Sequence, residues 1–330
     1  MLVEILLLLV GLALIIKGGD WFVSAAVHIA ELLNMPRVVI GSTLVSLTTT
    51  SPELVVSIVS GLKKESGLAV GNAVGSCICN IALILALSAV IRHIAVHPRI
   101  LRTPLVAMLL SGVLLLVLTM DLSLQRWQGF LLLGLGAVYF IYDFQHHMRA
   151  ARPSQHREAR IVGEQVVSKA WKETPWGATL QFLFGALVVI VGSKLLVDSA
   201  VGLASRLGVP SIVIGLSVVA VGTSLPEFVT AITSARRNVS DLAVGNVLGA
   251  NVANLTLVVG SAAAINDVTM VRFTQLYNFP AMLLLMLFLG GSIVFFRGLS
   301  RRSGLFMIGF YILYLTGLFA TVWLIRSSAS

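Results

Sequence analysis

The sequence is poor in charged residues. Asp, Glu, Lys and Arg make up 11% of its 330 residues, whereas a typical soluble domain carries roughly 25%. Apolar residues make up 57% of the chain. This balance excludes an ordinary soluble domain and predicts a protein that lies in the lipid bilayer.

Cysteine is also scarce. Cys77 and Cys79 are the two cysteines of the chain, and they lie two residues apart in an apolar segment. Two neighbouring thiols exclude a disulfide framework and are too few for a thiolate metal site. We interpret both as small packing residues and expect no cofactor.

Recognisable catalytic motifs are lacking as well. The sequence has no H-E-x-x-H pair, no paired-aspartate box and no nucleophile with an evident histidine partner. We therefore expect neither an enzyme nor any catalytic or cofactor-binding residue. The net charge of +9 comes from basic residues scattered through the loops, which argues against a nucleic-acid partner.

Long apolar runs are what the sequence has instead. A bilayer-spanning helix needs about 20 mostly apolar residues. Ten segments meet this requirement: 2–30, 37–61, 68–91, 104–120, 126–148, 177–205, 211–235, 242–265, 276–296 and 304–325. The first continues through charged residues without a small-residue cleavage site, so we expect a membrane helix there rather than a cleaved signal.

One stretch occurs twice. Residues 36–80 align without a gap with residues 210–254, at a constant offset of 174. Each copy belongs to a set of five predicted spans, and an odd number of spans places the second copy upside down in the membrane. We therefore predict an all-α membrane protein of ten transmembrane helices, built as two inverted five-helix repeats with broken helices at an ion site. The predicted domains are 1–148, a linker 149–175, and 176–330.

The distribution of Lys and Arg predicts the orientation. With the linker in the cytoplasm, the loops on its side hold 15 basic residues: Arg37, Arg92, Arg99, Arg102, Arg149, Arg152, Arg157, Arg160, Lys169, Lys172, Arg236, Arg237, Arg297, Arg301 and Arg302. The other side holds six: Lys63, Lys64, Arg126, Arg206, Arg272 and Arg326. Because cytoplasmic loops are enriched in Lys and Arg, we expect both termini outside and a location in the cell inner (plasma) membrane.

Each copy contains a proline followed by a glutamate, Glu53 or Glu227. A proline inside a helix leaves the carbonyl four residues earlier without its donor, which predicts free carbonyls at Thr48 and Gly222. Hydroxyl residues precede each proline. Carbonyl, hydroxyl and carboxylate oxygens are hard ligands that suit Na+ or Ca2+ better than zinc or copper.

A glutamate in the middle of a bilayer is costly and therefore marks a functional site. The alternative is that Glu53 and Glu227 are protonated and bonded to neighbouring helices, but their duplication among polar residues favours the ion site. The other charged residues of the spans form two close pairs on one helix each, and we expect both pairs to be structural and self-neutralising: Lys17 with Asp20, and Lys194 with Asp198.

The second part of each copy reads GNAVGSCICN (71–80) or GNVLGANVAN (245–254). Its glycines, four residues apart, predict close helix contact. Ser76 and Asn80 lie on one helix face, as do Ala250 and Asn254, and we expect these faces to point toward the ion site. The earlier asparagines of the two segments, Asn72 and Asn246, are expected to join helices.

The two motifs, present twice and inverted, resemble the α-repeats of the calcium/cation antiporters, the sodium/calcium exchanger family of prokaryotic type. The resemblance implies a core of four short helices flanked by two long tilted ones. It also implies ion ligands at these positions: Thr49, Thr50, Glu53, Ser76, Asn80, Thr223, Ser224, Glu227 and Asn254.

The sequence departs from the family pattern at four positions. Ser51 replaces an apolar residue before the proline, and Thr48 stands where the second copy has Gly222. Ala250 replaces a serine, which removes one hydroxyl ligand. Asn254 stands where several members have aspartate, so two carboxylates remain in the predicted site.

We therefore expect an antiporter that exchanges Na+ for Ca2+ by alternating access, with both ions as substrates, the lipid bilayer around it and a functional monomer. A Ca2+/H+ exchanger that uses the same two glutamates is the alternative, and the sequence separates the two weakly. A channel would more often show a pore ring repeated by oligomer symmetry than a duplication within one chain.

Overall fold

The computed structural model describes residues 2–62, 66–150, 174–206 and 220–329. The first half contains α1 (Leu2–Leu32), α2 (Arg37–Ile40), the π-helical turn η1 (Gly41–Val45), α3 (Ser46–Thr49), α4 (Ser51–Leu62), α5 (Ser66–Cys79), the π-helical turn η2 (Asn80–Leu85), α6 (Ala86–Ile91), α7 (Pro98–Leu118) and α8 (Arg126–Ala150). The second half contains α10 (Pro175–Arg206), α12 (Ala220–Thr223), α13 (Leu225–Arg236), α14 (Ser240–Ala253), η5 (Asn254–Val258), α15 (Val259–Ile265), η6 (Thr274–Asn278), α16 (Phe279–Phe296) and α17 (Arg301–Ala329).

The described residues form an all-α membrane protein. Eight of its helices are long and apolar enough to cross a bilayer, and the bent pair Arg37–Thr49 and Ser51–Leu62 makes a ninth span when it is counted as one. The predicted span 211–235 starts outside the described residues, and α12 and α13 occupy the rest of it. Ten spans therefore remain a prediction. Helix α7 begins earlier than predicted, at Pro98, because proline is well accepted in the first turn of a helix.

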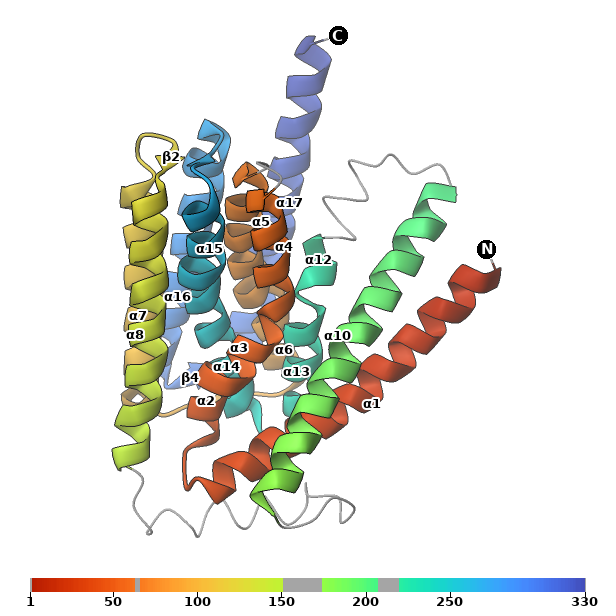
Figure 1. Ribbon diagram of the computed structural model, residues 1–330, viewed down its shortest axis with the longest axis vertical. Helices are drawn as coiled ribbons and strands as arrows, with labels where there is room; N and C mark the ends of the chain where they lie inside the picture. Colours follow the sequence, from red (N-terminus) through yellow and green to blue (C-terminus); the bar gives the residue numbers. More distant parts are fainter. Residues whose placement is uncertain (1, 63–65, 151–173, 207–219, 330) are drawn as a thin grey trace.

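Two long helices, α1 and α10, lie side by side and tilted against the rest of the bundle (Figure 1). Their backbones touch at two pairs of glycines. A Cβ atom placed on Gly192 would lie 3.0 Å from the carbonyl oxygen of Gly11, and one on Gly185 would lie 3.1 Å from that of Gly18. Such contact is possible where small residues face each other across two membrane helices.

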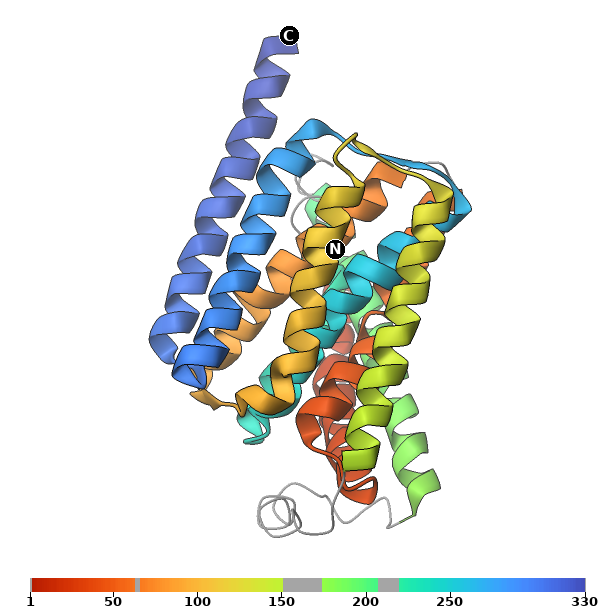
Figure 2. The same cartoon turned by 90° about the vertical axis from the view of Figure 1, so that its left-hand side faces the viewer.

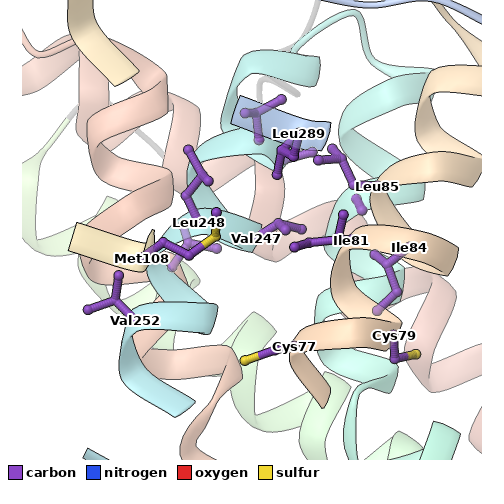
Figure 3. Close-up of a cluster of buried hydrophobic side chains, with 14 of the residues drawn as sticks. Cys77, Cys79, Ile81, Ile84, Leu85, Met108, Val247, Leu248, Val252 and Leu289 are labelled. Atoms are coloured by element: carbon purple, nitrogen blue, oxygen red, sulfur yellow. The ribbon is translucent and has the colours of Figure 1, made fainter. Parts of the chain in front are cut away.

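The segment α14–η5–α15 forms the centre of the bundle. Within Ser240–Ile265, 94% of the most apolar stretch is buried inside the protein. Its side chains Val247, Leu248 and Val252 pack with Met108 of α7 (Figure 3). Cys77 and Cys79 are also buried, as free thiols within the same core. They are packing residues, as predicted.

Two short antiparallel ribbons connect the halves of the chain at opposite ends of the bundle (Figure 1). Strand β1 (Ile94–Ala95) pairs with β4 (Gly298–Leu299), and β2 (Ser123–Leu124) pairs with β3 (Val268–Thr269). Ile94 faces Leu299 in one ribbon, and Leu124 faces Val268 in the other. Helices α16 and α17, which precede and follow β4 in the sequence, run along one edge of the bundle (Figure 2).

Candidate functional site

Both proline–glutamate motifs lie at a break between two helices. Helix α3 ends and α4 begins around Thr50, which has φ −80° and ψ −1°, and the helical segments on its two sides are bent by 43°. The second break has almost the same geometry, with Ser224 at φ −90° and ψ 13°. Each break places a glutamate, Glu53 or Glu227, in the first turn of the following helix. A negative side chain is stabilised there by the helix dipole.

The carbonyl that Pro52 was predicted to leave free has a donor. The Ser51 hydroxyl donates to the carbonyl oxygen of Thr48 over 2.7 Å. The prediction of a free Thr48 carbonyl is therefore wrong. Ser51, one of the departures from the family pattern, supplies the hydrogen bond that the proline nitrogen cannot make. The equivalent residue in the second copy, Leu225, has no hydroxyl.

The two copies exchange hydrogen bonds between hydroxyls and carboxylates. Thr50 Oγ1 donates to Glu227 Oε1 over 3.2 Å, and Ser224 Oγ donates to Glu53 Oε1 over 3.4 Å. Thr50 and Ser224 are equivalent positions, so each break provides a donor for the glutamate of the other copy. The four residues therefore form one site, although they come from opposite halves of the sequence.

The second oxygen of each carboxylate has a different environment. Glu53 is 1% exposed and Glu227 is fully buried. The Oε2 atoms of both are buried and have no hydrogen-bond partner among the described residues. A buried carboxylate is destabilising by several kcal/mol unless a cation or a proton accompanies it. The unpartnered Oε2 atoms fit the role of cation ligands.

Two more of the predicted ligands come from α5 and from the first residue of η2 that follows it. Ser76 and Asn80 are buried, and the Ser76 hydroxyl accepts a hydrogen bond from Ser224 over 3.3 Å. The Asn80 amide donates to Asn251 Oδ1 over 3.1 Å, whereas its own Oδ1 has no partner among the described residues. Asn80 therefore also presents an oxygen that is available to an ion.

Asn80 and Asn254 each begin a π-helical turn, η2 and η5. Such turns are rare and occur mostly at functional sites. Asn254 is fully buried, and neither its Oδ1 nor its Nδ2 has a hydrogen-bond partner among the described residues. The equivalent asparagines of the two copies thus share both their backbone setting and an unpartnered side-chain oxygen.

Thr49 and Thr223 are equivalent threonines that directly precede the two breaks. Thr49 is buried and donates to Asn246 Oδ1 of α14 over 3.1 Å. Asn246 therefore joins two helices, as predicted, but it does so through a predicted ion ligand. Thr223 ends α12, directly before the break at Ser224.

Two glycines of the second copy let α14 approach this site. A Cβ atom on Gly245 would lie 2.0 Å from the carbonyl oxygen of Val38, and one on Gly249 would lie 2.2 Å from that of Ser42. Only glycine can occupy such positions without a shift of the backbone. The predicted close contact between glycines and a neighbouring helix is thus confirmed for this copy.

Sequence reasoning missed Asn251. Its Oδ1 accepts from Asn80, and its Nδ2 lies 3.5 Å from the sulfur of Met108. Its counterpart in the first copy is Cys77, whose thiol lies 3.8 Å from the Asn251 carbonyl. The signal available in the sequence was a third asparagine in the segment 245–254. It stands at a position where the two copies differ, since the first copy has Cys77 there.

The structure corrects the pairing predicted for the charged residues of the spans. Asp20 binds Arg237, whose Nη2 and Nε atoms lie 2.8 and 3.2 Å from Asp20 Oδ1. Among the described residues, neither Lys17 with Asp20 nor Lys194 with Asp198 forms an ion pair. The guanidinium of Arg237, at the end of α13, contacts Asp20 with two nitrogens. The single ammonium group of Lys17, on the helix of Asp20, cannot make two such contacts.

The donor set of the site consists of oxygens. Hydrogen bonds link two carboxylates and three hydroxyl groups, and two asparagines of the same copies present oxygens without a partner among the described residues. The described residues contain no cluster of three or more His, Cys, Asp or Glu side chains. The carboxylates together carry a charge of −2 when ionised, which one Ca2+ or two Na+ would balance. Hard oxygen ligands of this kind suit these two ions.

Comparison with known proteins agrees with this chemistry. The family described as sodium/calcium exchanger protein matches residues 3–144 and 177–320, which include both breaks and the helices around them. The chain belongs to the sodium/calcium exchanger family. It is thus a member of a family of cation antiporters, in its prokaryotic form, as the repeated motifs predicted.

Relatives of this exchanger match it over nearly its whole length. Inner membrane protein YrbG of Escherichia coli is 33% identical over 97% of this chain and 98% of its own. Sodium/calcium exchanger MaX1 of Methanosarcina acetivorans is 28% identical over 96% of this chain and 99% of its own. Among solved structures, the sodium-calcium exchanger NCX_Mj, soaked with zero Na+ and Ca2+, superposes with a TM-score of 0.82 at 28% identity, over 96% of this chain and 99% of that chain.

Proposed function

We propose that this exchanger moves Ca2+ across the membrane in exchange for Na+ by alternating access. The observation that carries the proposal is the crossed pair of hydrogen bonds between Thr50 and Glu227 and between Ser224 and Glu53. One site with two buried carboxylates can hold either one Ca2+ or two Na+, so the two ions compete for it. Competition for one site couples their movements, provided that the empty carrier crosses poorly.

The ligands that we assign offer side-chain oxygens, and all of them except Thr223 are buried. They are Thr49, Thr50, Glu53, Ser76, Asn80, Thr223, Ser224, Glu227 and Asn254. The assignment is supported by the unpartnered oxygens of four of them, Glu53, Glu227, Asn80 and Asn254. The carbonyl of Thr48 is left out, because the Ser51 hydroxyl already donates to it.

For the architecture we propose ten transmembrane helices in two inverted five-helix repeats. Three sets of contacts support a two-fold relation between the copies: the crossed hydroxyl–carboxylate bonds, the two strand ribbons at opposite ends of the bundle, and the glycine pairs between α1 and α10. Each contact has a counterpart about 174 residues further along the chain. Inversion of the repeats would supply the two states that alternating access requires.

For the orientation we propose that the linker 149–175 lies in the cytoplasm and that both termini lie outside, in the inner membrane. The excess of Lys and Arg on the linker side supports this. The start of α1 and the end of α17 point toward the same end of the bundle, opposite to the end of α8 (Figure 1).

Ion flux into vesicles tests the proposed exchange. Purified protein is reconstituted into vesicles loaded with Na+, and Ca2+ uptake is measured when Na+ is diluted outside at equal pH on both sides. Uptake that depends on the Na+ gradient supports Na+/Ca2+ exchange. Uptake that follows a pH gradient and is indifferent to Na+ would instead establish a Ca2+/H+ exchanger, in which the Oε2 atoms of Glu53 and Glu227 carry protons.

A further inference from the structure

A polar pocket lies at the end of the bundle, away from the two breaks. Its volume is about 310 Å3, and it lies where α2, α7 and α14 begin, beside β1. The polar side chains that line it include Arg37, Arg92, His93, His97, Ser240 and Asp241. This basic pocket contains none of the ligands assigned to Na+ and Ca2+.

The charges of the basic pocket are mostly positive. Arg37 and Arg92 contribute two permanent positive charges, and Asp241 contributes one negative charge. The Arg37 Nε atom lies 3.7 Å from Asp241 Oδ2, which is too long for a hydrogen bond. The Arg37 Nη1 atom is buried and has no hydrogen-bond partner among the described residues. One edge of this guanidinium therefore lacks a partner among the described residues.

Two long helices begin at the basic pocket. Helix α14 starts after Val239 without a side-chain cap on its first turn, whereas α7 starts at Pro98, which has no N–H to donate. The first N–H groups of a helix lack partners within the helix and carry a partial positive charge. Ser240 adds a hydroxyl that is buried, at 8% exposure of the residue, and has no partner among the described residues. An oxyanion is the ligand that all these donors would satisfy together.

We propose that the basic pocket binds a phosphate group, either as the free anion or as the headgroup of an acidic phospholipid. An arginine presents two parallel donors to two phosphate oxygens, and helix starts are common phosphate sites. Arg37 and the start of α14 hold the oxygens, Ser240 donates one further hydrogen bond, and Arg92 closes the exposed side. The pocket is large enough for one phosphate group.

The repeat of the sequence makes this site specific to one end of the protein. The residues 174 positions after Arg92 and His93 are Asn266 and Asp267. The equivalent end of the second half thus has an amide and a carboxylate in place of the basic residues, and Asp267 accepts a hydrogen bond from the backbone of Arg126 over 2.9 Å. The phosphate site belongs to the end that the count of basic residues assigns to the cytoplasm, where acidic lipids are enriched.

Thermal unfolding of the purified full-length protein in a neutral detergent tests this proposal. One series adds inorganic phosphate against chloride at equal ionic strength. A second adds dioctanoyl phosphatidic acid against dioctanoylglycerol. We expect the unfolding midpoint to rise with phosphatidic acid, with inorganic phosphate, or with both. A response to phosphatidic acid alone identifies the lipid as the source, and a response to inorganic phosphate identifies the free anion.

Variants locate the binding. In Arg37→Gln and Arg92→Gln we expect the ligand concentration for half of the midpoint shift to rise about tenfold or more, because each removes a charged donor. Arg102→Gln, an exposed arginine of α7 outside the pocket, should respond like the unaltered protein. If Arg37→Gln does not fold, the exposed residues Arg92 and His93 are changed to Gln together instead. Absence of any shift in the unaltered protein, or equal shifts in all variants, would overturn the proposal.

Discussion

The hydroxyl of Thr50 provides a sharp test of the site, because it can be removed without a change of shape. Thr50 is 3% exposed and donates to Glu227 Oε1 over 3.2 Å. In Thr50→Val a methyl group replaces the hydroxyl, and the carboxylate loses a donor as well as a neighbouring ligand oxygen. We expect Ca2+ to bind more weakly and the protein to remain folded.

The magnitude follows from the type of bond. A hydrogen bond to a charged group contributes about 1.5–3 kcal/mol, which corresponds to roughly a tenfold to hundredfold change in affinity. Ser224→Ala removes the equivalent hydroxyl and should have an effect of similar size. It should also release Ser76, because the Ser224 hydroxyl contacts Ser76 Oγ as well as Glu53.

The assay is the concentration of Ca2+ that gives half-maximal uptake into vesicles at a fixed Na+ gradient. Thr48→Val is the matched control, because the Thr48 hydroxyl donates back to the Leu44 carbonyl of its own helix over 2.7 Å. The control should stay within about twofold of the unaltered protein. If Thr50→Val and Thr48→Val change the Ca2+ requirement equally, Thr50 does not contribute to ion binding.

Four further predictions follow from the same geometry. Glu53→Gln or Glu227→Gln removes one of two site charges and should abolish Ca2+ uptake while gel filtration shows a folded protein; normal uptake by either would remove that residue from the site. Ala250→Ser adds a hydroxyl beside the asparagine of η5 and should lower the Na+ concentration needed for half-maximal exchange, with K+ not required in either form; an unchanged Na+ requirement would mean that position 250 does not face the ions. A cysteine introduced by Ser154→Cys should react with an impermeant thiol reagent in inverted vesicles and not in intact cells; labelling of intact cells would reverse the orientation. Gly249→Ala should lower the unfolding free energy by about 1–3 kcal/mol, since its Cβ would lie 2.2 Å from a backbone oxygen; an unchanged thermal midpoint would argue against this helix contact.

Much of the fold was predictable because the bilayer restricts it. Backbone polar groups must be satisfied internally in lipid, so long apolar segments become helices. The repeat also indicated which residues belong together. Glu53 and Glu227 come from segments that are 174 residues apart in the sequence, and the equal spacing around them marked one site before any contact was known.

The partners within the site could not be read from the sequence. The hydrogen bonds run between copies rather than within one, and they depend on how the two broken helices cross. Asn251 was overlooked for a related reason, since its partner Asn80 lies on another helix and its repeat position holds Cys77. Asp20 was assigned to Lys17 because spacing along one helix is visible in a sequence, whereas the approach of Arg237 is not.

Another contact that only the structure reveals lies beside η1. The Ser42 hydroxyl donates to Asp143 Oδ2 over 2.8 Å, and His147 Nδ1 lies 3.5 Å from Asp143 Oδ1. Asp143 is fully buried on α8, and nothing in the local sequence distinguishes it from an exposed residue near a helix end. Its partner is supplied by a helix about 100 residues earlier in the chain.

The most direct test of the central claim is Ca2+ uptake into Na+-loaded vesicles at equal pH on both sides. The account predicts that uptake starts when external Na+ is diluted, stops when Na+ is equal on both sides, and is lost in Glu53→Gln and Glu227→Gln. Uptake of the same rate without a Na+ gradient, or in vesicles that contain either variant, would contradict it.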